Sequence, residues 1–191
     1  DVPELYAEAV RASREIVVDH IRPARDAAAA AGLPIIYLTN YLAPSTSAST
    51  EWRNLSIRTC GVDVLESWTE PNEILAFSDV IAPRPGDHLI KKQMYSGFFE
   101  THLDSLLRGL GVRNLVAVGF DLRICLGTTL TDAMYRNYRV VLLRDCTGTG
   151  EHPETREGDW MNWTGIRYIE SNVGYTSTSA DFVRACSESV T

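Results

Sequence analysis

A cysteine and a lysine stand where they could act together on a carbonyl carbon. Cys125 follows an apolar run at Leu115–Val118, a glycine at position 119 and a short connector, and it opens a segment of helical character. Backbone N–H groups and the helix dipole at such a point favour an anion, so a thiol there ionises more readily and becomes a nucleophile. The alternative is an ordinary packing residue, because free cysteine is often buried.

Lys92 lies just beyond another apolar segment, in the run KKQMYSGFF from Lys91 to Phe99. An ammonium near a thiol favours the thiolate and can stabilise negative charge on a reacting substrate. The connector between Gly119 and Cys125 could present backbone N–H groups to such an oxyanion. A lysine taken alone is more often a solvated surface residue, so the hypothesis depends on the combination.

Short apolar strands alternate with amphipathic helices along the chain. We predict strands at Pro34–Leu38, His88–Lys91, Asn114–Val118, Arg139–Leu143 and Tyr168–Glu170, and helices at Val2–Arg11, Glu15–Ala31, Thr101–Gly109, Cys125 to about Asn137, Trp160–Trp163 and Ser179–Cys186. The alternation predicts βαβ units, and hence an α/β fold with a parallel sheet and helices on both faces. Ligands in such folds bind beyond the carboxyl ends of the strands, where Asn40, Lys92 and Cys125 would lie. Trp52 and Trp68, in the less regular stretch between, either pack in the core or wall a substrate pocket.

Composition and charge exclude several classes of function. The 191 residues suffice for one domain, and 45% hydrophobic with 23% charged residues is typical of an ordinary globular protein. A net charge of −7 without a basic stripe argues against nucleic acid as a partner. The sequence has no apolar run as long as a membrane span and no glycine-rich dinucleotide or nucleotide motif, so we expect neither a membrane association nor a cofactor. Four scattered cysteines favour a reducing, cytoplasmic location.

The run from Lys92 to Cys125, KQMYSGFFETHLDSLLRGLGVRNLVAVGFDLRIC, resembles the core of the isochorismatase-like cysteine hydrolases. It is most similar to their ureidoacrylate amidohydrolase and N-carbamoylsarcosine amidase branch, and the segment LTDAMYRNYRVVLLRDCTG after the cysteine extends the likeness. The resemblance covers roughly Ile16 to Tyr175. It implies a three-layer, Rossmann-like parallel sheet flanked by helices. It also implies an Asp–Lys–Cys triad that hydrolyses an amide or ureido C–N bond of a small molecule through a thioester.

The resemblance assigns roles by position. Cys125 would be the nucleophile and Lys92, rather than Lys91, the lysine of the triad. The oxyanion donors would be the backbone N–H groups of Cys125 and of Asp121, the latter after a cis peptide between Phe120 and Asp121. The candidate substrate-binding residues, any of which could equally pack in the core or lie on the surface, are Asn40, Trp52, Tyr95, Phe98 and Arg123, with Arg123 or His152 as partners for a substrate carboxylate.

The aspartate of the triad is the largest departure from the family pattern. It lies on a first strand in the family, and the sequence shows no such strand before the helix at Glu15, while Asp1 stands too close to the first helix. We expect this strand upstream of residue 1, with residues 1–191 otherwise forming a single domain. The alternative is a non-catalytic scaffold or binding protein that has lost the aspartate.

Further departures concern the connector and the metal. The connector reads Asp121-Leu122-Arg123-Ile124-Cys125, where the family usually has a small residue followed by threonine. An acidic side chain there would oppose an oxyanion unless it points away or pairs with Arg123. The Asp-x-His-His pattern of nicotinamidases is replaced by Thr39-Asn40-Tyr41-Leu42, so we expect no zinc. Relatives are commonly oligomers, and we expect a homodimer or homotetramer. A redox thiol protein, with Cys146 as a spatial partner of Cys125, is a further but weaker interpretation.

Overall fold

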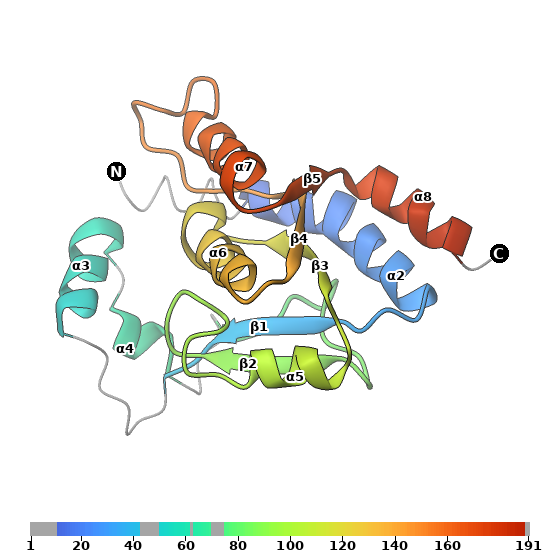
Figure 1. The fold of residues 1–191 in the computed structure, drawn as a ribbon. Helices are drawn as coiled ribbons and strands as arrows, with labels where there is room; N and C mark the ends of the chain where they lie inside the picture. Colours follow the sequence, from blue (N-terminus) through green and yellow to red (C-terminus); the bar gives the residue numbers. More distant parts are fainter. Residues whose placement is uncertain (1–10, 43–49, 62, 70–74, 190–191) are drawn as a thin grey trace.

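Parallel strands form two sheets in the computed structural model, which describes residues 11–42, 50–61, 63–69 and 75–189 (Figure 1). In the first sheet, β1 (Ile36–Asn40) pairs with β2 (His88–Lys92), and the register places Asn40 opposite Lys92. In the second, β4 (Arg139–Thr147) lies between β3 (Asn114–Gly119) and β5 (Tyr175–Ser177). Asn40 and Lys92 therefore end neighbouring strands at the same edge.

Helices cover both faces of the second sheet. The π-helical turn η1 (Val17–Ile21), α2 (Arg22–Ala30) and α8 (Ser179–Ser189) lie on one face, whereas α6 (Gly127–Tyr135) and α7 (Trp160–Asn172) lie on the other (Figure 1). The side chains of β4 show this division, because Leu142 packs with the core of α6 and α7 while Leu143 packs with that of α2. The predicted α/β class, with parallel strands flanked by helices, is confirmed.

The remaining helices surround the first sheet. α5 (Leu103–Gly109) lies beside β2, and its leucines share one hydrophobic core with Ile90 of β2 and Leu142 of β4 (Figure 1). α3 (Thr50–Cys60) and the short α4 (Val64–Ser67) carry a separate aromatic cluster. No helix in the described ranges has the length and apolar character needed to cross a bilayer.

The structure differs from the predicted elements chiefly near the carboxyl end. The predicted strand at Tyr168–Glu170 is wrong, because α7 continues through these residues to Asn172. The chain turns only at Gly174, where a Cβ atom would lie 2.4 Å from the carbonyl oxygen of Val140, so a glycine is needed for the close approach that starts β5. α3 was not predicted. Apart from its last residue, the predicted helix at Val2–Arg11 lies outside the described residues.

Candidate active site

The helix that carries Cys125 begins earlier than the sequence predicts. Asp121 caps the π-helical turn η3 (Leu122–Leu126) by accepting a hydrogen bond from the backbone N–H of Arg123 at 2.8 Å, and η3 continues directly into α6. The expectation that Cys125 opens the helix is therefore wrong by three residues. Gly127 permits the π turn, because a Cβ atom there would lie 2.3 Å from the carbonyl oxygen of the first residue of η3. Such turns often occur at functional sites.

Lys92 places its ammonium against the sulfur of Cys125. The side chain is 4% exposed, and Nζ donates to Cys125 Sγ at 3.4 Å, to the carbonyl oxygen of Met94 at 3.1 Å and to Asn40 Oδ1. An ammonium has three protons, so these three acceptors match its donors. Burial lowers the pKa of Lys92, and the adjacent Cys125 sulfur opposes that shift. Lys91, by contrast, is exposed and lies over the ring of Tyr41.

An aromatic cluster packs beside the lysine. The ring centroid of Trp52 lies 5.0 Å from that of Trp68 and 5.7 Å from that of Tyr95, and the Trp68 ring lies 5.3 Å from Lys92 Nζ. Trp52 is 7% exposed, and its indole N–H has no hydrogen-bond partner among the described residues. Trp52 is therefore part of a small core that packs beside Lys92, with the half-buried Trp68 against it, and neither ring lines the cavity described next.

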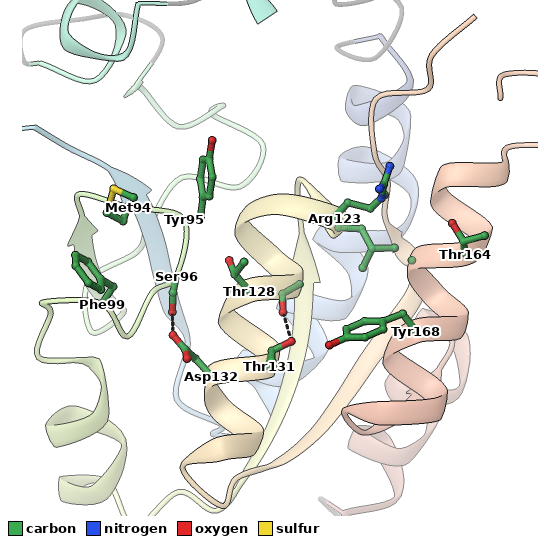
Figure 2. Close-up of a pocket in the computed structure, with 13 residues that line it drawn as sticks. Met94, Tyr95, Ser96, Phe99, Arg123, Thr128, Thr131, Asp132, Thr164 and Tyr168 are labelled. Carbon is green, nitrogen blue, oxygen red and sulfur yellow. Dashed lines mark hydrogen bonds between the residues drawn. The ribbon is translucent and has the colours of Figure 1, made fainter. Parts of the chain in front are cut away.

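A cavity of about 700 Å³ opens next to this centre (Figure 2). Tyr95 and Phe99 line one side, α6 lies in the middle, and Arg123 and Tyr168 line the other side. Cys125 and Lys92 do not line it themselves. They adjoin it through neighbouring lining residues, since Met94 binds Lys92, and Thr128 donates to the carbonyl oxygen of Cys125 at 3.2 Å.

The structure separates the predicted substrate-binding residues into groups. Tyr95 and Arg123 line the cavity, and Asn40 binds the lysine. Phe98 is a correction: it is 6% exposed and stacks on Tyr138 at 6.0 Å in the hydrophobic core, so it lies away from the cavity. Its neighbour Phe99 takes the position that the prediction gave to Phe98. His152, the other candidate partner for a carboxylate, is exposed and does not line this cavity.

The carboxylate of Asp121 is hydrogen-bonded to neighbouring residues of the protein. It accepts hydrogen bonds from the backbone N–H of Arg123, from Thr149 Oγ1 at 2.6 Å and from the backbone N–H of Gly150 at 3.0 Å. Of the two alternatives for Asp121, pairing with the Arg123 side chain is not found in the described residues; the bond comes from the Arg123 main chain instead. The peptide between Phe120 and Asp121 is cis, as the resemblance implied.

Sequence reasoning missed two contributors to this centre. Met94 acts through its carbonyl oxygen, which no side-chain pattern reveals. Thr129 donates to the carbonyl oxygen of Cys125 at 2.7 Å, and its spacing of four residues from the cysteine was the one available signal. In the described residues, His, Cys, Asp and Glu side chains form no group of three or more that could hold a metal ion.

Known proteins share this arrangement of strands and helices. Residues 5–172 match the isochorismatase domain. The ureidoacrylate amidohydrolase RutB of Methylorubrum extorquens is 32% identical over 184 residues, which is 90% of this chain and 70% of that protein. RutB of Azorhizobium caulinodans is 32% identical over 176 residues, covering 84% and 72%. A cysteine hydrolase structure from Pseudomonas syringae has a TM-score of 0.82 at 25% identity, covering 93% of this chain and 83% of that one. An N-carbamoylsarcosine amidase from Thermoplasma acidophilum has a TM-score of 0.66 at 26% identity, covering 87% and 84%. The chain therefore belongs to the isochorismatase family.

Proposed function

We propose that this protein is a cysteine-dependent amidohydrolase that cleaves a linear C–N bond of a small ureido, carbamoyl or carboxamide compound. The observation that carries the proposal is the contact of 3.4 Å between Lys92 Nζ and Cys125 Sγ, made by a buried ammonium. A positive charge at that distance can stabilise negative charge that develops on the sulfur and on a reacting substrate. Similarity to proteins named ureidoacrylate amidohydrolase and N-carbamoylsarcosine amidase supports a C–N bond as the target.

In the proposed reaction, the Cys125 sulfur attacks the carbonyl carbon of the substrate. The C–N bond then breaks, and the nitrogen takes up a proton and leaves as ammonia or an amine. Water hydrolyses the resulting thioester, which releases the acid and restores the thiol. The backbone N–H groups of Asp121 and Cys125 would bind the oxyanion of each tetrahedral intermediate. Lys92 would keep a positive charge beside the sulfur throughout.

We propose that an additional strand between β1 and β3 carries the aspartate that accepts the thiol proton. Within the described residues, β1 pairs with β2 alone and β3 with β4 alone, so each has one edge without a strand partner. Val116 and Val118 of β3 are 43% and 36% exposed, which is unusual for valines in the middle of an α/β fold. One inserted strand would join the two sheets into a single domain. Amide hydrogen exchange in the full-length protein tests this: slow exchange along both edges is expected, and fast exchange would contradict the proposal.

The surroundings of Arg123 support a substrate with a carboxylate. Its side chain lines the cavity, and no carboxylate among the described residues pairs with its guanidinium. Asp132, the carboxylate of the cavity, accepts from Ser96 at 2.5 Å and contacts Arg136 at 3.4 Å. Gly165 of α7 packs against the first turn of η3, since a Cβ atom there would lie 3.0 Å from Leu122 Cδ2 and 3.4 Å from Arg123 Cγ. An unpaired guanidinium among aromatic and hydroxyl groups suits a ureido or carbamoyl acid.

We propose further that the protein is a cytoplasmic homodimer or homotetramer. Large aromatic side chains on α6 and α7 are exposed, with Tyr135 at 74%, Trp160 at 53% and Trp163 at 49%, and aromatic side chains are enriched at interfaces. The free thiols of Cys125, Cys146 and Cys186 support a reducing compartment. Light scattering after size-exclusion chromatography tests the assembly, and a monomer would contradict it.

Ammonia release from a panel of ureido acids, carbamoyl acids and carboxamides tests the activity itself. We expect at least one of these compounds to be hydrolysed by the full-length protein, and Cys125→Ala to abolish that release. Cys186→Ala, which removes a thiol from α8, serves as the control and should retain the activity. Activity that survives in Cys125→Ala would refute the cysteine mechanism. A full-length wild-type protein that hydrolyses none of the panel would favour a non-catalytic binding protein instead.

A further inference from the structure

Two side-chain hydrogen bonds hold the loop that follows Lys92 against α6: Ser96 donates to Asp132 at 2.5 Å, and the buried hydroxyl of Thr129 accepts from the loop backbone. The backbone N–H of Gly97 donates to Thr129 Oγ1 at 2.9 Å, and Thr129 is 7% exposed. A glycine is needed at position 97, because a Cβ atom there would lie 2.7 Å from Leu38 Cδ1 of β1. The loop backbone therefore packs directly between β1 and α6.

The same hydroxyl contacts the main chain of the nucleophile. Thr129 Oγ1 donates to the carbonyl oxygen of Cys125, one helical turn earlier, at 2.7 Å. A threonine hydroxyl has one proton and two lone pairs, so it can accept from the loop and donate to Cys125 at the same time. At the other end of the loop, the carbonyl oxygen of Met94 accepts from Lys92 Nζ, which also contacts Cys125 Sγ.

These contacts close a ring that runs from Lys92 through its loop to Thr129, on to Cys125 and back to Lys92. We infer that Thr129 is a positioning residue that sets the separation of the Cys125 sulfur from the Lys92 ammonium. It contacts neither of these two groups and acts through the loop and the helix that carry them. The inference rests on the proposed function of the Lys92–Cys125 pair.

Replacing the hydroxyl by a methyl group opens this ring without changing the shape of the side chain. In Thr129→Val the N–H of Gly97 loses its acceptor in a buried place, which favours a shift of the loop although the bond from Ser96 to Asp132 remains. Met94 would move with the loop and take one of the three partners of the ammonium away. A displacement on the order of 1 Å in a catalytic arrangement is enough to lower a rate by roughly a hundredfold.

The test compares Thr129→Val, Thr129→Ala and Thr129→Ser with the wild type. Thr59→Val is the matched control, because Thr59 in α3 makes the same bond to the carbonyl four residues earlier, at 2.8 Å, away from the site. The readouts are the rate at which iodoacetamide alkylates Cys125, followed by mass spectrometry, the separate values of kcat and KM, and the melting temperature.

We expect Thr129→Val and Thr129→Ala to lower both the alkylation rate and kcat by roughly tenfold or more, with KM little changed. Thr129→Ser keeps the hydroxyl and should restore both rates, while Thr59→Val should match the wild type. If Thr129→Val does not fold, the contrast between the alanine and serine variants decides the matter. A serine variant no better than alanine, or an alkylation rate that none of the changes affects, would overturn the inference.

The alkylation rate separates this inference from the proposed function. It needs no substrate, so it reports on the Lys92–Cys125 separation even if no amide in the panel is hydrolysed. If the wild type hydrolyses none of the compounds but the alkylation rate still depends on the Thr129 hydroxyl, the proposed amidohydrolase activity is refuted and the positioning role of Thr129 stands. If the wild type hydrolyses a compound but the alkylation rate is the same in all variants, the proposed activity stands and the positioning role is refuted.

Discussion

Cys125 and Cys146 both lie near the carboxyl ends of parallel strands, yet their surroundings are opposite. Cys125, beyond β3, is partly exposed and contacts the ammonium of Lys92. Cys146, within β4, is 0% exposed, and burial together with the neighbouring Asp145 carboxylate raises the pKa of its thiol to about 12. The sulfur beyond β3 thus lies beside a cation and is partly exposed, whereas the sulfur in β4 is buried beside an anion.

The difference shows that position at a strand end does not by itself make a reactive cysteine. Asp145 instead binds the first residue of α8, since it accepts hydrogen bonds from the backbone N–H of Ser179 at 2.8 Å and from the Ser179 hydroxyl at 2.6 Å. Burial alone would raise the pKa of Asp145, but these bonds bring it below its usual value. The carboxylate at the β4 end therefore anchors α8, whereas the β3 end leads to the proposed nucleophile. These surroundings also give no support to a redox pair of Cys125 and Cys146, because the Cys146 thiol, with its raised pKa, does not ionise at neutral pH.

The largest change should come from removing the cation. In Lys92→Met a flexible apolar chain of similar length replaces the lysine, so the sulfur loses its ammonium partner. We expect kcat/KM to fall roughly a hundredfold or more, the scale of losing one group that stabilises developing charge. Lys91→Met, which changes the exposed neighbour, should remain near wild type. An equal loss of kcat/KM in Lys92→Met and Lys91→Met would contradict a specific role of Lys92 beside the sulfur.

A smaller and substrate-dependent loss is expected at the cavity. Arg123→Met should lower kcat/KM for substrates that bear a carboxylate by roughly tenfold to a hundredfold, the usual value of a hydrogen bond to a charged group. Neutral carboxamides should be hydrolysed as before. The measurement is the ratio of kcat/KM for an acid and for its neutral amide analogue, and an unchanged ratio would contradict the assigned specificity.

The alkaline limb of the pH profile should distinguish Lys92 from an ordinary lysine. Its lowered pKa means that the folded protein releases this proton below pH 10.5, so activity should fall before that pH. Between the lowered pKa and 10.5 the unfolded chain binds more protons, and the free energy of unfolding contributed by Lys92 therefore rises with pH. Urea denaturation across this range should show the rise in the wild type and lose it in Lys92→Met.

The smallest expected effect lies at the β4 end and concerns stability alone. Ser179→Ala removes the hydroxyl that donates a hydrogen bond to Asp145, and should lower the free energy of unfolding by about 1–2 kcal/mol. Ser187→Ala, which removes an exposed bond within the same helix, should cost little. Neither variant should change kcat, and a loss of activity in Ser179→Ala would blur the contrast between the two strand ends.

The sequence predicted the main features of the fold because they depend on local periodicity. The strands that end near Asn40, Lys92 and Cys125 were found, since apolar runs mark buried strands and parallel strands end at a common edge. The predicted strand at Tyr168–Glu170 failed because a short apolar segment inside a helix has the same appearance. The packing of Gly174 against Val140, which the sequence does not reveal, marks the point where the chain leaves α7 for β5.

The candidate site was predicted less completely, for a physical reason. Lys92 and Cys125 carry distinctive chemistry, whereas the groups that hold them act through main-chain atoms or a single hydroxyl, as Met94 and Thr129 do. Phe98 and Phe99 are adjacent in a turn, where no regular alternation shows which ring faces the core. The π turn at η3 was also hidden, because it depends on the close approach of Gly127 to the carbonyl oxygen of Leu122.

The most direct test of the Lys92–Cys125 pair is the rate of Cys125 alkylation by iodoacetamide at pH 7, compared with N-acetylcysteine under the same conditions. The contact between the Cys125 sulfur and the Lys92 ammonium predicts that Cys125 reacts faster than the free compound, that Cys146 stays unmodified, and that Lys92→Met removes the advantage. Alkylation of Cys125 no faster than the free thiol, or equally fast without Lys92, would contradict the account.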